Sequence, residues 1–120
     1  MAKKLKIYVY DRCGTCRKAC QFLDDHDVPY DKHPIRDTPP TKSELKTMLA
    51  RYDGDIRRLF NTSGLDYKAM NLKDKLPDLS ESEAIDLLTT NGNLVRRPFV
   101  IGADFLAAGF KEHEWTALTT

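Results

Sequence analysis

The residues best suited to chemistry are two cysteines, Cys13 and Cys16, which are separated by a glycine and a threonine. They follow a short run of β-branched and aromatic residues, Leu5–Tyr10, which predicts a strand. Apolar side chains then recur at spacings of three and four over residues 15–27, which predicts a helix. Cys13 is therefore expected in the loop before this helix, and Cys16 in its first turn.

The start of a helix stabilises a thiolate, because free backbone N–H groups and the helix dipole present positive charge there. Arg12, Arg17 and Lys18 add basic charge nearby. The layout predicts a redox site in which Cys13 is the nucleophile, with a lowered pKa, and Cys16 is the resolving thiol.

The same spacing also occurs in half of a zinc site and in pairs of ordinary thiols. A structural zinc site needs four ligands, and the remaining candidates are Cys20, His26, His33 and His113. None of them forms a second closely spaced pair, so no metal site is expected. The histidines are interpreted as surface residues. Cys20, one helical turn after Cys16, is interpreted as a small core residue.

The composition is typical of a water-soluble globular protein with a modest core. The chain has 120 residues, of which 41% are hydrophobic and 31% charged, and its formal net charge is +1. This balance argues against direct nucleic-acid binding. No apolar run approaches the roughly 20 residues that cross a membrane, and no signal peptide is recognised. Three cysteines, an odd number, fit a reducing compartment, so a cytoplasmic location is expected.

The first third of the chain predicts a β-α-β unit, since residues 28–35 are typical of a second strand, parallel to the first. The block that follows predicts helices alone. Capping-box patterns at Thr41–Glu44 and Ser80–Glu83 begin two of them, and shorter helices are expected over 56–60 and 66–70.

The last part of the chain predicts a hairpin of strands at 98–101 and 105–108, followed by a helix over about 111–118. Trp115 is expected to pack this helix onto the sheet, beside Phe110. The predicted fold is therefore α/β and thioredoxin-like, with the order β-α-β, helical insertion, β-β-α and a mixed sheet.

One domain is expected over the whole chain. Its predicted parts are a thioredoxin-like core at 1–38 and 94–120 and a helical insertion at 39–93.

Pro98 begins the strand that is expected to face the cysteine loop. In thioredoxin-like folds this position holds a cis proline, so a cis Arg97–Pro98 peptide is predicted there. Arg96 and Arg97 precede it, and guanidinium groups that face a thiolate can hold an oxyanion or carboxylate by forked hydrogen bonds. One of two adjacent side chains normally points away. Arg57 and Arg58, in the helical block, are further candidates for the anion-binding group.

Three segments together resemble the ArsC/Spx family: Cys13–Ala19, Leu94–Ile101 and Gly109–Trp115. This family contains glutaredoxin-coupled arsenate reductases and Spx-type regulators that bind RNA polymerase. The resemblance covers nearly the whole chain. It implies a thioredoxin fold in which the cysteine matching Cys13 carries the arsenate adduct of the reductases.

The arsenate reductases of the family surround that adduct with three arginines. Arg97 matches the arginine before the proline, and Arg57 matches the one in the insertion. The third should follow the hairpin, where Phe105–Gly109 contains none. A serine is usual where Cys16 stands. These departures predict weak arsenate reduction, and the cysteine pair with its Arg-Arg-Pro sequence is more similar to Spx-type proteins.

The sequence therefore favours an ArsC-like thiol–disulfide oxidoreductase. Cys13 would attack an oxidised substrate or an oxyanion, and Cys16 would displace the product, leaving a disulfide for an external thiol donor to reduce. The expected donor and partner is the thioredoxin system or glutathione with glutaredoxin, and no bound cofactor is expected. The alternative is an Spx-like redox sensor whose disulfide changes its affinity for RNA polymerase.

Overall fold

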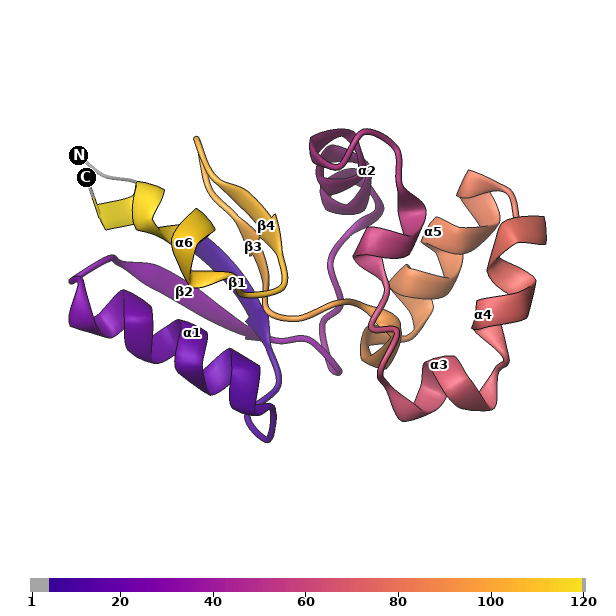
Figure 1. Cartoon of the computed structure of the whole chain (residues 1–120), viewed down its shortest axis with the longest axis horizontal. Coiled ribbons are helices and arrows are strands. Elements are labelled where there is room, and N and C mark those ends of the chain that lie inside the picture. The colour runs from indigo at the N-terminus through magenta and orange to yellow at the C-terminus, as the bar shows by residue number, and fades with distance from the viewer. Residues whose placement is uncertain (1–4, 120) are drawn as a thin grey trace. The chain divides into compact units, whose positions relative to one another are not determined.

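The computed structural model describes residues 5–119 (Figure 1). The chain divides into two compact units. One comprises the chain up to Pro34 and again from Arg97, and is called the sheet unit. The other comprises Ile35–Arg96 and is called the helical unit. In the sequence, the helical unit is thus inserted between the two halves of the sheet unit.

The sheet unit contains a four-stranded sheet in the order β2-β1-β3-β4. Its strands are β1 Leu5–Val9, β2 Tyr30–Pro34, β3 Phe99–Ile101 and β4 Leu106–Ala108. β1 pairs parallel with β2 and antiparallel with β3, and β3 pairs antiparallel with β4. The sheet is mixed, and the predicted thioredoxin-like order of strands and helices is confirmed.

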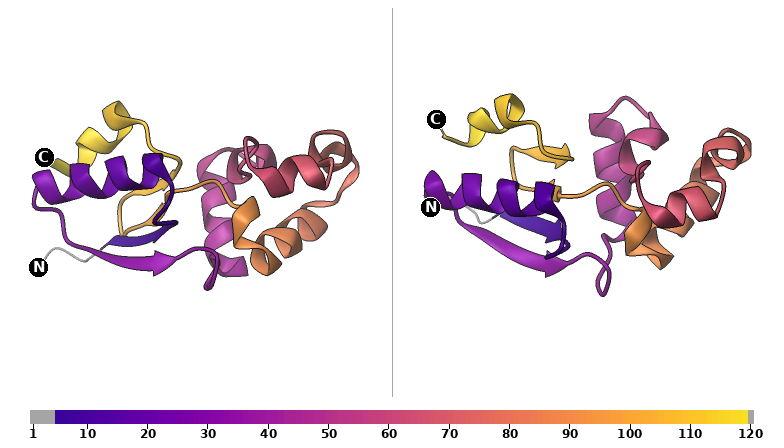
Figure 2. Two further views of the ribbon diagram at one scale, coloured as in Figure 1. Left: turned by 90° about the horizontal axis from the view of Figure 1, so that it is seen from below. Right: turned by 60° about the horizontal axis from the view of Figure 1, so that its bottom comes forward.

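One face of this sheet is covered by helices α1 (Gly14–Asp25) and α6 (Glu112–Trp115), the latter continued by a 3-10 helix, η4 (Thr116–Thr119). Figure 2 shows both helices from two further sides. Side chains alternate between the two faces of a strand. Every second residue of β1 therefore lies in the core between the sheet and these two helices. The buried members of that core are Leu5, Ile7, Val9, Cys16, Ala19, Phe22, Leu23, Val100, Ala107 and Trp115.

The positions of the aromatic residues and histidines in the sheet unit confirm one prediction and correct another. Trp115 is fully buried and meets Phe110 edge-on, with 4.8 Å between ring centroids, which confirms the predicted packing. His26 and His113 are exposed, as expected. His33 is not at the surface but half-buried, because its ring lies beside that of Tyr8 at 5.3 Å.

The helical unit consists of short helices around an apolar interior. They are α2 Lys42–Arg51, η1 Ile56–Leu59, α3 Leu65–Ala69, α4 Leu72–Lys75, η2 Leu76–Asp78, α5 Glu81–Thr90 and η3 Gly92–Leu94. Both predicted capping boxes are present: the hydroxyls of Thr41 and Ser80 accept hydrogen bonds from the N–H groups of Glu44 (3.2 Å) and Glu83 (3.1 Å). No helix within residues 5–119 is long and apolar enough to cross a membrane.

A carboxylate joins two parts of the helical unit that are distant in the sequence. Asp66, in α3, accepts hydrogen bonds from the side-chain amides of Asn91 (3.0 Å) and Asn93 (3.2 Å). These bonds favour the charged carboxylate and lower the pKa of Asp66. They fasten α3 to the chain that leaves α5.

Gly92 is a position of the helical unit where only glycine fits. A Cβ at Gly92 would lie 1.8 Å from the carbonyl oxygen of Ile35, so the backbone of Gly92→Ala must move. This variant is expected to lose about 3 kcal/mol of unfolding free energy. Gly14→Ala is the matched control, since nothing lies within 4 Å of its added Cβ. Urea denaturation followed by circular dichroism measures both, and equal stabilities would contradict the prediction.

Candidate functional site

The antiparallel pairing of β1 and β3 brings the cysteine loop beside the start of β3. Tyr8 lies opposite Phe99 in the register, so the chain that leaves β1 after Val9 passes the chain that arrives at β3. Arg97 and Pro98 belong to that arriving segment. The peptide bond between them is cis, which confirms the prediction from the sequence.

Cys13 is the residue that immediately precedes α1. Its backbone is extended and it occupies the N-cap position. Its N–H donates to the carbonyl oxygen of Tyr10 at 2.9 Å, and its own carbonyl accepts from the N–H of Arg17 at 3.1 Å. The thiol therefore lies where the first N–H groups of the helix have no carbonyl partner within the helix.

The environment of Cys13 favours its thiolate. Burial alone would raise the pKa of the Cys13 thiol, but hydrogen bonds from the backbone and side chain of Cys16, together with a hydrogen bond and the positive charge of Arg97, bring this pKa below its ordinary value. Cys13 is only half-buried. It is therefore both the more acidic and the more accessible thiol of the pair, as predicted.

Cys16 has the opposite character. Its side chain is 2% exposed, and burial, reinforced by the neighbouring Cys13, raises the pKa of the Cys16 thiol to about 12. Cys16 is thus protonated at neutral pH and donates a hydrogen bond to the Cys13 sulfur. The two thiols therefore differ in acidity and in accessibility.

Arg97 is held so that part of its guanidinium remains available. Its Cζ lies 4.9 Å from the centre of the Tyr10 ring, a cation–π contact that fixes the plane of the group. Its Nη1 is buried and has no hydrogen-bond partner among the described residues. A buried donor without a partner is costly, and an oxygen atom of a substrate held at Cys13 would satisfy it.

The predicted anion-binding residues Arg57 and Arg96 belong to the helical unit. Burial, followed by the positive charges of Arg58 and Arg57, lowers the pKa of Arg96. Arg96 and Arg97 therefore have different neighbours, as expected for adjacent side chains in an extended segment. That Arg57 and Arg96 act together with Cys13 remains a prediction.

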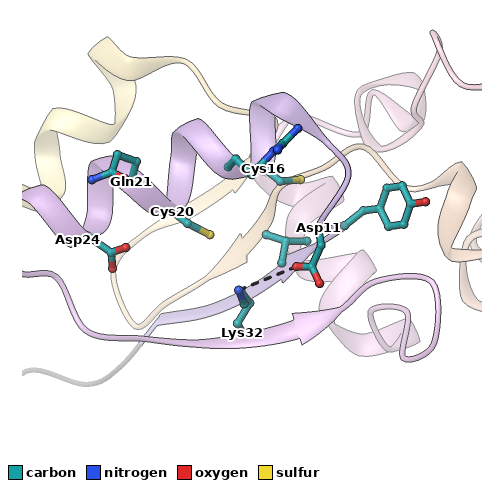
Figure 3. A pocket seen from close by; sticks show the side chains of 9 residues that line it. Asp11, Cys16, Cys20, Gln21, Asp24 and Lys32 are labelled. Carbon is teal, nitrogen blue, oxygen red and sulfur yellow. Dashed lines mark ion pairs between the residues drawn. The ribbon is translucent and has the colours of Figure 1, made fainter.

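Cys20 differs from its prediction as a small core residue. It packs against the core of the sheet unit but remains partly exposed. Together with Cys16 and Lys32 it lines a cavity of about 270 Å³ (Figure 3). Burial raises the pKa of the Cys20 thiol, so Cys20 is a weaker nucleophile than Cys13 at neutral pH.

This cavity was not predicted from the sequence. Its wall includes Lys32 of β2, which forms an ion pair with Asp11 at 3.9 Å. In the register Ile7 lies opposite Lys32, so Lys32 points to the same face of the sheet as the core residues of β1. The signal in the sequence is that a charged residue occupies a core-facing position of a strand at the edge of the sheet.

The described residues contain no group of three or more histidine, cysteine, aspartate or glutamate side chains that could hold a metal ion. The candidate site consists of Cys13, Cys16 and Arg97, followed by the cis Pro98.

The fold and the thiol pair define a protein of the thioredoxin-like class. Within this class, the chain belongs to the ArsC family, whose family model matches residues 8–118. A solved structure of a protein related to this family, from Bacteroides fragilis, is 41% identical and has a TM-score of 0.91, over 98% of this chain and 99% of that one.

Two curated relatives extend the comparison. The chain is 40% identical over 111 residues to the uncharacterized protein YusI of Bacillus subtilis, covering 92% of this chain and 94% of YusI. It is 29% identical over 110 residues to the global transcriptional regulator Spx 1 of Lactococcus lactis, covering 92% of this chain and 84% of the regulator. The resemblance found in the sequence is thereby confirmed.

Arg97→Gln tests the electrostatics of the site. Removing the positive charge and the hydrogen bond from Arg97 should raise the pKa of Cys13, so that less thiolate is present near neutral pH and alkylation there becomes slower. The measurement is the rate of iodoacetamide labelling of Cys13 against pH, read by peptide mapping. Arg17→Gln is the matched control, since Arg17 is an exposed residue of α1. A pH profile of Arg97→Gln identical to that of the wild type would contradict the role of Arg97.

Proposed function

We propose that the protein is a thiol–disulfide oxidoreductase in which Cys13 is the nucleophile and Cys16 the resolving thiol. The observation that carries this proposal is the opposite displacement of the two pKa values within a single helical turn: that of Cys13 is lowered and that of Cys16 is raised. The lowered pKa suits Cys13 for the first attack, and the protonated Cys16 beside it can supply the proton that a departing thiolate takes up.

In the first step, the Cys13 thiolate attacks one sulfur of a disulfide substrate. The substrate S–S bond breaks, its other sulfur leaves as a thiolate, and a mixed disulfide forms between Cys13 and the substrate. Arg97 lies beside the reacting sulfur and offers its unpartnered Nη1 to polar groups of the substrate.

In the second step, the Cys16 sulfur attacks Cys13 of the mixed disulfide. The bond between Cys13 and the substrate breaks. The proton of Cys16 passes to the departing substrate thiolate. The substrate has then gained two electrons, and the protein carries a Cys13–Cys16 disulfide. An external dithiol such as thioredoxin, or two molecules of glutathione with glutaredoxin, would return the protein to its reduced form.

The second candidate function is that of a redox-sensing regulator. The likeness to Spx 1 favours it, because that relative is a transcriptional regulator. The same Cys13–Cys16 disulfide would then change the affinity for a partner, RNA polymerase being the expected one. A regulator needs only to be oxidised and reduced, whereas an oxidoreductase sustains many turnovers. Multiple turnover of purified protein favours the enzyme, and copurification with polymerase subunits favours the regulator.

Reduction of a model disulfide, coupled to NADPH through thioredoxin or through glutathione and glutaredoxin, is expected to continue for many turnovers. Cys13→Ser should abolish it, and Cys16→Ser should trap the mixed disulfide. Cys20→Ser is the matched control: it should keep the activity and still lose two hydrogens in mass on mild peroxide treatment. Full activity of Cys13→Ser would contradict the proposal. Loss of the mass change in Cys20→Ser would instead assign Cys20 to the disulfide.

Arsenate reduction is expected to be weak. Ala107 and Ala108 occupy β4, where the resemblance leads us to look for a third arginine, and both are buried. Lys111, the next basic residue, is exposed. The absence of one charged donor to a desolvated anion costs about 1.5–3 kcal/mol, which is roughly ten- to a hundredfold in rate. The same coupled assay with arsenate measures this, and rapid turnover that Cys13→Ser abolishes would contradict it.

A further inference from the structure

The helical unit contains a cluster of arginines around the ring of Tyr52. The Cζ atoms of Arg51 and Arg58 lie 4.8 Å and 4.5 Å from the centre of this ring. Arg51 ends α2, Arg58 lies in η1, and the Tyr52 side chain between them is 9% exposed. Stacking on an aromatic ring holds the planar guanidinium groups in defined orientations.

Arg96 joins this cluster from the other end of the helical unit. Its backbone N–H donates to the carbonyl oxygen of Leu59 at 2.8 Å, which places it next to Arg58 in the structure. Its Nε is buried and has no hydrogen-bond partner among the described residues. Burial, and then the charges of Arg58 and Arg57, lower the pKa of Arg96. The guanidinium group is thus close to other positive charges, and its buried Nε has no hydrogen-bond partner among the described residues.

Contacts within the protein explain part of this cluster. The positive charge of Arg51 is stabilised by the negative end of the α2 dipole and by the Tyr52 ring. The charge of Arg58 is stabilised by the same ring. Asp55 partly offsets the positive charge at Arg96. Within residues 5–119, however, none of the arginines at 51, 57, 58 and 96 forms an ion pair with a carboxylate. Neighbouring positive charges and a buried N–H without an acceptor are both unfavourable, and a bound anion would relieve both.

We propose that the helical unit binds a small polyvalent oxyanion of the phosphate type through Arg58 and Arg96, with Arg51 and Arg57 adding positive charge. The rigid fork of a guanidinium matches the oxygens of a phosphate group, and several such forks suit an anion with more than one phosphate, such as a diphosphate. The site requires neither cysteine of the redox pair and goes beyond the proposed thiol chemistry.

Calorimetric titration of the whole protein with inorganic pyrophosphate at low ionic strength tests this proposal. The wild type should bind saturably, and added salt should weaken the binding. Arg58→Gln and Arg96→Gln should each lose about tenfold or more in affinity. Arg96→Lys keeps the charge but lacks the Nε donor, so it should also bind more weakly. Circular dichroism checks that each variant is folded, and Arg96→Lys keeps the test valid if a glutamine variant does not fold.

Two controls separate this site from the redox site. Lys18→Gln removes one positive charge from the exposed face of α1, and Cys13→Ser removes the nucleophile; both should bind pyrophosphate as the wild type does. Absence of binding, or equal binding by Arg96→Gln, Arg96→Lys and the wild type, would overturn the proposal. Loss of binding in Cys13→Ser would assign the anion to the redox site, and tighter binding of citrate than of pyrophosphate would overturn the preference for phosphate.

Discussion

The candidate site depends on the position of Cys13 at the N-cap of α1, where the N–H groups of the first turn have no carbonyl partner within the helix and favour a thiolate. Burial alone would raise the pKa of Cys13, and the backbone and thiol of Cys16, together with Arg97, outweigh it and lower this pKa. Since Cys16 lies one turn further into the core, the same helix presents one thiol whose pKa is lowered and one whose pKa is raised.

The sheet supplies the part of the site that the helix cannot. Arg97 is far from Cys13 in the sequence, and only the antiparallel pairing of β1 and β3, with Tyr8 opposite Phe99, brings the two segments together. The core on the covered face holds this register, because a shift by one residue would move Ile7 and Val9 out of the apolar layer below α1. The geometry of the candidate site and the packing of the core are therefore set by the same strand pair.

Local signals in the sequence were sufficient for most of the fold. The run of β-branched and aromatic residues in β1, the capping boxes at Thr41 and Ser80, and the proline before β3 each act over a few residues. Helix α4 was not predicted, because it is a single turn that follows Asn71 in the left-handed conformation (φ 53°). The bonds from Asn91 and Asn93 to Asp66 join residues whose proximity exists only in the folded chain.

For the candidate site, the thiol pair and the Arg97–Pro98 segment could be predicted because each is marked by a short motif. The partial exposure of Cys20 could not, since its helical spacing matches that of the core residues of α1, and what differs is the cavity beside it. The different neighbours of Arg96 and Arg97 follow from alternation along an extended chain. The identity of those neighbours required the structure.

The close approach of Gly92 to the carbonyl of Ile35 also bears on how this chain can vary. Ile35 is the first residue of the helical unit and Gly92 lies shortly before its end, so the inserted chain departs and returns at nearly the same point. The entropy cost of closing such a loop rises only slowly with its length. The length of the chain between these two points can therefore vary at little cost in loop-closure entropy, provided that the close contact of Gly92 with Ile35 is kept.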